Sequence, residues 1–223
     1  MLIPSAPARN MAFIHTVSGL ISEFEDLAKQ HLPDWKPFAV LDESLLRDTI
    51  ERGSLSDLTI RRLAIYIWSA VDAGADAIVV TCSTLGPAVD AIEPLCPVPL
   101  FRIDEGMAKA AVEHGNRIGV MATLSTTLVP TVDLLKRQAH EAGKDVTVDY
   151  VLVQGAFQLL AGGDVETHDA QLRQALEELS QKVDVIVLAQ ASMARAARGM
   201  THCIPVLTSP VFGIENVKRR LEQ

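Results

Sequence analysis

Short apolar runs alternate along the chain with segments whose apolar residues recur at helical spacing. The runs predict strands at residues 11–16, 37–41, 77–81, 98–101, 117–121, 146–153, 183–189 and 204–207. The helical spacing predicts helices at residues 20–30, in segments up to Ala73, from about 85, and at 104–113, 125–142, 168–181, 192–198 and from about 211. Strands that alternate with helices are typical of α/β proteins, in which helices cover both faces of a parallel sheet.

One predicted strand ends abruptly in small polar residues. The apolar run at 77–80 is followed by Thr81-Cys82-Ser83-Thr84 and then by Gly86-Pro87, where a strand gives way to a helix. A thiol there would lie at the sheet edge where open parallel sheets bind ligands, and helix N–H groups would favour its thiolate. The alternative is a small cysteine buried in the core, which is the commoner role of a lone cysteine.

The chain also matches itself at a constant shift. Residues 76–85 match 184–193, with Cys82 aligned on Gln190 at a shift of 108 (190 − 82), and residues 13–18 match 120–125 at a shift of 107. Cys96-Pro-Val-Pro-Leu similarly resembles Cys203-Ile-Pro-Val-Leu. Unrelated strand–helix units can look alike, but three segments in register favour duplication. We therefore expect two flavodoxin-like parallel-sheet halves related by a pseudo-twofold, with a ligand site in the cleft between them.

The shift also divides the chain. We expect an irregular N-terminal extension at residues 1–10 and an N-terminal half at 11–103 that includes the C-terminal helix from about 211. Residues 104–210 would form the C-terminal half.

Composition excludes several classes of function. The 223 residues are 48% hydrophobic, enough for a large core, and the net charge of −8 disfavours binding to nucleic acid or anionic membranes. No apolar run approaches the roughly 20 residues that span a bilayer. Three cysteines without CxxC spacing and six histidines without ligand spacing predict neither disulfides nor a metal site. This cysteine usage predicts a protein of the reducing cytoplasm. Since glycine-rich phosphate motifs are also missing, we expect no cofactor.

The predicted cleft gathers neutral hydrogen-bonding groups and one thiol. Its expected members are Thr16, Ser18, Cys82, Ser83, Thr84, Thr123, Ser125, Thr126, Gln190 and Ser192. Hydroxyls and helix-start N–H groups can hold an anion without a counter-charge, so this set suits a small carboxylate. Residues 157–164 and 41–43 are expected to set the size of the substrate.

Residues 80–84, 118–126 and 187–193 together resemble the aspartate/glutamate racemase superfamily, which includes hydantoin racemase, maleate cis–trans isomerase and arylmalonate decarboxylase. The resemblance covers residues 11–217. It implies that one cysteine from each half flanks the α-carbon of a carboxylate substrate, with Cys82 at the first position and Ala122–Thr126 on a carboxylate-binding loop. It also implies a dimer or larger homo-oligomer.

The second cysteine position is occupied by Gln190, whose amide does not exchange protons near neutral pH. His15 is the first candidate for the missing acid–base group, although a structural histidine is an equal alternative. Glu105, His114 and His168 are weaker candidates.

Three reactions fit a single thiol. Cys82 could exchange the α-proton of a small carboxylate, as in a racemase or epimerase; add to an unsaturated dicarboxylate and isomerise it; or protonate the enediolate left by decarboxylation. The resemblance favours the first, a racemase acting on an Asp-, Glu- or hydantoin-like substrate. A protein that only binds a small anion is the alternative outside catalysis.

Overall fold

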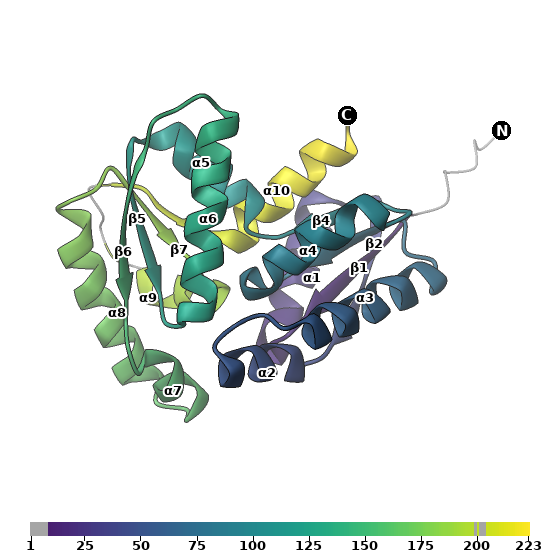
Figure 1. The fold of residues 1–223 in the computed structure, drawn as a ribbon, viewed down its shortest axis with the longest axis horizontal. Helices are drawn as coiled ribbons and strands as arrows, with labels where there is room; N and C mark the ends of the chain where they lie inside the picture. The colour runs from purple at the N-terminus through teal and green to yellow at the C-terminus, as the bar shows by residue number, and fades with distance from the viewer. Residues whose placement is uncertain (1–8, 199, 201–203) are drawn as a thin grey trace.

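The computed structural model describes residues 9–198, 200 and 204–223, which form two four-stranded parallel sheets (Figure 1). The first sheet has the order β2-β1-β3-β4, with β1 at Arg9–His15, β2 at Trp35–Leu41, β3 at Ala77–Val80 and β4 at Leu100–Arg102. The second has the order β6-β5-β7-β8, with β5 at Arg117–Ala122, β6 at Thr147–Leu152, β7 at Val185–Leu188 and β8 at Val206–Thr208. The predicted α/β class with two halves is confirmed.

The two sheets repeat each other in register. Met11 of β1 pairs with Ala77 of β3, and Ile118 of β5 pairs with Val185 of β7. Before β3, the Asp76 carboxylate accepts a hydrogen bond from the backbone N–H of Asn10 at 2.7 Å, and before β7 the Asp184 carboxylate accepts one from Arg117 at 2.9 Å. The same acidic residue thus fixes the start of the same strand pair in each half, as the shift along the sequence predicts.

Helices cover both sheets. They are α1 (Ile21–His31), α2 (Ser44–Arg52), α3 (Asp57–Asp72), α4 (Gly86–Ile92), α5 (Glu105–His114), α6 (Ser125–Glu141), α7 (Ala156–Ala161), α8 (Val165–Ser180), α9 (Ala194–Ala197) and α10 (Ser209–Leu221). Short 3₁₀ turns lie at Ser18–Leu20, Ser83–Leu85, Glu93–Leu95 and Ala191–Met193. None of the helices in the described ranges is long and apolar enough to cross a membrane.

The last helix returns to the first sheet. Ile214 and Val217 of α10 join the core formed by Met11 and Phe13 of β1, whereas α5 packs against β5 and β7 of the second sheet. In Figure 1, α10 extends from the C-terminal half towards the strands of the N-terminal half, beside α5. Helices α5 and α10, which directly follow the edge strands β4 and β8, therefore each cross to the other half and tie the two halves together.

Several element boundaries differ from the sequence-based expectation. Arg9 and Asn10 belong to β1 rather than to an irregular extension, because they pair with Trp35 and Lys36; residues 1–8 lie outside the description. The strand expected at 98–101 is shifted to end at Arg102, and the one expected at 204–207 is Val206–Thr208. Helix α7 was not expected.

Helix α8 begins at Val165 instead of residue 168, because the Asp164 side chain caps it by accepting a hydrogen bond from Thr167 N–H. Cys203, aligned above with Cys96, is not among the described residues.

Candidate active site

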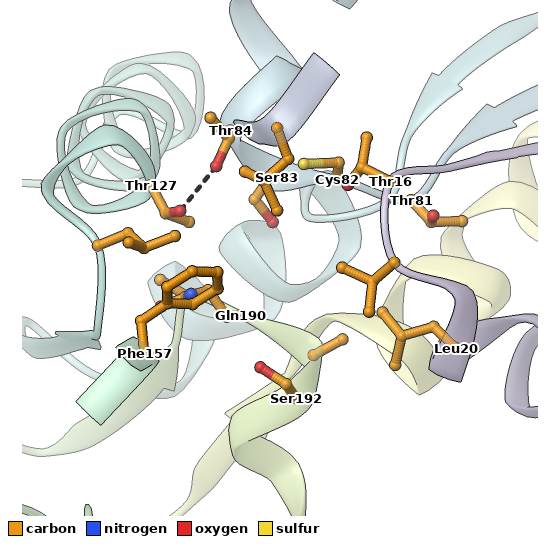
Figure 2. Close-up of a pocket in the computed structure, with 15 residues that line it drawn as sticks. Thr16, Leu20, Thr81, Cys82, Ser83, Thr84, Thr127, Phe157, Gln190 and Ser192 are labelled. Carbon is orange, nitrogen blue, oxygen red and sulfur yellow. Dashed lines mark hydrogen bonds between the residues drawn. The ribbon is translucent and has the colours of Figure 1, made fainter. Parts of the chain in front are cut away.

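A pocket of about 50 Å³ lies between the halves, at the ends of β1, β3 and β7 (Figure 2). The N-terminal half contributes Thr16, Val17, Leu20, Leu46, Thr81, Cys82, Ser83 and Thr84, and the C-terminal half contributes Leu124, Thr127, Phe157, Ala189, Gln190, Ala191 and Ser192. The predicted cleft site is therefore present, since both halves contribute the residues that follow their central strands.

Cys82 and Gln190 occupy equivalent positions in this pocket. Each directly precedes a 3₁₀ turn in extended backbone conformation, with φ −109° and ψ 110° at Cys82 and φ −126° and ψ 134° at Gln190. Each carbonyl accepts a hydrogen bond from the residue three positions later, at 3.0 Å from Leu85 and 3.1 Å from Met193. The glutamine therefore stands where the duplication requires the counterpart of the thiol.

Burial raises the pKa of the Cys82 thiol above its usual value. Hydrogen bonds from the Thr16 side chain and from the backbone N–H groups of Leu85 and Thr84 oppose this rise but do not cancel it. The N–H groups at the helix start thus act in the expected direction, towards the thiolate, but burial outweighs them. The raised pKa favours the protonated thiol, which can donate a proton.

Gln190 is held by a threonine that corresponds to Thr16. Its amide oxygen accepts hydrogen bonds from Thr123 N–H at 2.7 Å and from the Thr123 hydroxyl at 2.9 Å. Because both donors act on the oxygen, the amide NH₂ remains to donate to a ligand. Thr123 is thus a residue that positions Gln190, and is not itself among the lining residues.

His15 is buried behind Thr81 and is not part of the described pocket lining. Its side chain is 1% exposed, lies against Phe13 and Phe24, and places Nδ1 2.9 Å from the Thr81 hydroxyl. Desolvation lowers the pKa of His15 to about 4, so the imidazole is neutral. The structure therefore favours a structural histidine over the second acid–base group expected for it.

The other predicted site residues divide into two groups. Thr16, Ser83, Thr84 and Ser192 line the pocket, together with Cys82 and Gln190. Ser18, Ser125 and Thr126 are not among its described lining residues: Ser18 donates its N–H to the Glu43 carboxylate, and Ser125 is exposed. The weaker candidates Glu105, His114 and His168 are also outside that lining. Glu105 binds Lys109 and Arg220, His114 contacts the Ala110 carbonyl, and His168 contacts Asp169.

Sequence reasoning missed Thr127 and the apolar part of the lining. The Thr127 hydroxyl lies 2.7 Å from that of Thr84, a hydrogen bond that joins the two halves beside the pocket. A third hydroxyl in Ser125-Thr126-Thr127 was the available signal, but only the helix orientation shows which one faces inward. Phe157, within the segment expected to set substrate size, does line the pocket.

The family model of Asp/Glu/Hydantoin racemase matches residues 15–216. The chain belongs to this family. A search of curated proteins finds no match to this chain. Solved structures share its fold. A candidate Asp/Glu racemase from Yersinia pestis has a TM-score of 0.74 at 19% identity, covering 96% of this chain and 100% of that one.

Two further structures agree. Glutamate racemase RacE1 from Bacillus anthracis has a TM-score of 0.71 at 15% identity, covering 97% of this chain and 83% of that one. Allantoin racemase from Klebsiella pneumoniae has a TM-score of 0.67 at 17% identity, covering 96% and 88% respectively. At these identities the likeness concerns the fold. Membership of this family supports an isomerase, and the residues of this chain decide which reaction its site can perform.

Proposed function

We propose that this protein catalyses proton transfer at the α-carbon of a small carboxylate, with Cys82 as the acid–base group on one face. The observation that carries the proposal is the placement of Cys82 opposite Gln190, at duplicated strand ends around one pocket. The reaction needs no cofactor in this scheme, because the Cys82 thiol supplies a proton and its thiolate accepts one.

The pocket offers donors for the charge that such a reaction develops. Removing an α-proton or carbon dioxide leaves an enediolate, whose negative charge rests on the former carboxylate oxygens. The hydroxyls of Thr16, Ser83 and Ser192 and the Gln190 amide NH₂ are neutral donors around the same space. A fixed donor aimed at developing charge contributes roughly 3 kcal/mol to lowering a barrier.

Racemisation is the family reaction, and it requires proton exchange on both faces. In our proposal Cys82 serves one face, and solvent must serve the other because Gln190 cannot take up or release a proton. The substrates would be Asp-, Glu- or hydantoin-like, as the names of the structural neighbours suggest.

One-sided protonation is the second candidate, and the raised pKa of Cys82 favours it. A malonate-type substrate would lose carbon dioxide as its carbon–carbon bond breaks, with the electron pair remaining as the enediolate. The Cys82 S–H would then give its proton to the α-carbon, and solvent would reprotonate the thiolate. Cis–trans isomerisation needs the thiolate to add to the double bond, just as α-proton removal needs it as the base, and the raised pKa of Cys82 disfavours the thiolate in both reactions.

Proton NMR in deuterium oxide tests these reactions. The protein is incubated separately with L-Asp, L-Glu, a hydantoin and phenylmalonate, with Cys82→Ala as the control. Uptake of α-deuterium that disappears in the control supports the proposal, and carbon dioxide release with phenylmalonate identifies the second candidate. If the compounds bind but none of the four takes up deuterium, the proposed catalysis is rejected in favour of a protein that only binds small anions. The expected cytoplasmic location and self-association stay predictions.

A further inference from the structure

A second, larger chamber of about 680 Å³ adjoins the thiol pocket. The two spaces share Thr16, Val17, Leu46 and Phe157 in their linings, so they lie on either side of the same side chains. The inner space of about 50 Å³ has room for a carboxylate-sized group, since a single water needs roughly 10–15 Å³ on the same measure. Any larger part of a substrate must therefore extend into the chamber.

The wall of the chamber is mostly apolar and comes from both halves. Its apolar members are Val17, Leu46 and Ile50 from the N-terminal half and Phe157, Leu160 and Ala161 from the C-terminal half. Helix α2 carries Leu46 and Ile50 on one side, and α7 carries Phe157, Leu160 and Ala161 on the other. The space between these helices thus offers an apolar surface to any part of a substrate that extends beyond the thiol pocket.

The charged residues of the chamber do not suit a second carboxylate. Arg47 of α2 is flanked four positions earlier by Glu43, the N-cap residue of the helix, and four positions later by Glu51, so all three face the chamber. Arg47 also lies 3.7 Å from the Asp48 carboxylate. Among the described lining residues these charges sum to −1, which disfavours an additional anion.

We propose that the substrate carries a neutral apolar group on its α-carbon, aromatic or branched aliphatic, which lies between α2 and α7. The inference rests on the proposed function, because it takes the carboxylate to be held beside Cys82. It departs from the side-chain carboxylates of aspartate and glutamate.

Protection of Cys82 from alkylation tests the inference with three probes: acetate, phenylacetate and succinate. The protein is titrated with each probe, and iodoacetamide labelling of the Cys82 peptide is followed by mass spectrometry. We expect phenylacetate to protect with a dissociation constant roughly 30- to 100-fold below that of acetate, because its ring leaves water for the chamber. Succinate should bind no more tightly than acetate.

Helix α7 offers a matched pair of variants. Leu160→Glu places a charge in the chamber and should remove most of the advantage of phenylacetate over acetate, whereas Gln158→Glu adds the same charge on the exposed side and should preserve it. Leu160→Lys should instead strengthen succinate binding. Circular dichroism of each variant checks that it is folded. The comparison of the three probes on the wild-type protein tests the inference even if a variant does not fold.

The outcomes separate the two proposals. Succinate binding more tightly than phenylacetate to the wild-type protein would overturn the apolar chamber and leave the proposed function intact. Equal effects of Leu160→Glu and Gln158→Glu would also overturn it. If none of the three carboxylates protects Cys82, the proposed function fails as well.

Discussion

Replacing Gln190 with cysteine should convert a one-sided site into a two-sided one. The change puts a second thiol at the strand end equivalent to that of Cys82, next to Thr123, as Thr16 is next to Cys82. A positioned acid–base group typically accelerates proton transfer 10²- to 10⁴-fold. We therefore expect Gln190→Cys to interconvert the enantiomers of 2-phenylpropanoate at least about 100-fold faster than the wild-type protein.

The substitution also has a calculable structural cost. It removes the two hydrogen bonds from Thr123 to the Gln190 amide oxygen, at 2.7 and 2.9 Å. Each contributes about 1 kcal/mol, so the free energy of unfolding should fall by about 2 kcal/mol. For a chain of this size that corresponds to a melting temperature lower by about 4–8 °C.

Gln190→Ala is the matched control, because it removes the same hydrogen bonds without adding a thiol. Chiral chromatography measures the loss of enantiomeric excess, NMR in deuterium oxide measures α-deuterium uptake, and calorimetry measures the melting temperature. Both variants should be destabilised alike, and only the cysteine variant should gain racemisation. Equal racemisation rates in the two variants would refute the assignment of position 190 to the second face.

Three further predictions concern groups around the site. Arg102 is 5% exposed and binds the fully buried Asp104 carboxylate at 2.8 and 2.9 Å. Arg102→Met should therefore lower the free energy of unfolding, measured by urea titration, by about 3–5 kcal/mol. Arg137→Met, which removes an exposed arginine, should lower it by less than about 1 kcal/mol. Because the pKa of His15 falls from 6.5 unfolded to about 4 folded, the unfolded state binds more protons between these values. The free energy of unfolding should reach its full value above pH 7 and be about 2 kcal/mol lower at pH 5. Urea titrations at the two pH values should show a smaller difference for His15→Gln. A methyl group on Gly213 of α10 would collide with the backbone between β4 and α5, so Gly213→Ala should lower the urea-unfolding free energy by about 1–3 kcal/mol unless α10 shifts.

The position of the site was predictable because it depends on strand ends. Cys82 and Gln190 follow buried apolar runs, and the shift of 108 between them needs only the sequence. Parallel strands then place both residues at the same kind of edge. Nothing about the packing of the helices was needed to reach this conclusion.

The properties of the site depended on packing that the sequence does not display. The N–H neighbours of Cys82 were foreseeable, but the burial that outweighs them depends on how the side chain packs against the core of the first half. His15 follows the same strand-end rule as Thr16, yet its ring turns to Phe13 and Phe24 on the other side. The apolar chamber likewise exists only because α7, which sequence periodicity missed, faces α2.

The asymmetry of the site resides in one pair of residues on a duplicated scaffold. Thr16 bonds to the Cys82 sulfur and Thr123 bonds to the Gln190 amide, so each half supports its strand-end residue with the same kind of side chain. Exchanging sulfur for an amide keeps that support and a donor towards the ligand, but removes proton exchange from one face. Under the proposed function, hydroxyls from both halves would hold the carboxylate while proton exchange is confined to one face. The same proposal assigns the Cys82 thiol, whose pKa burial raises, the delivery of a proton to a carbanion held between the halves.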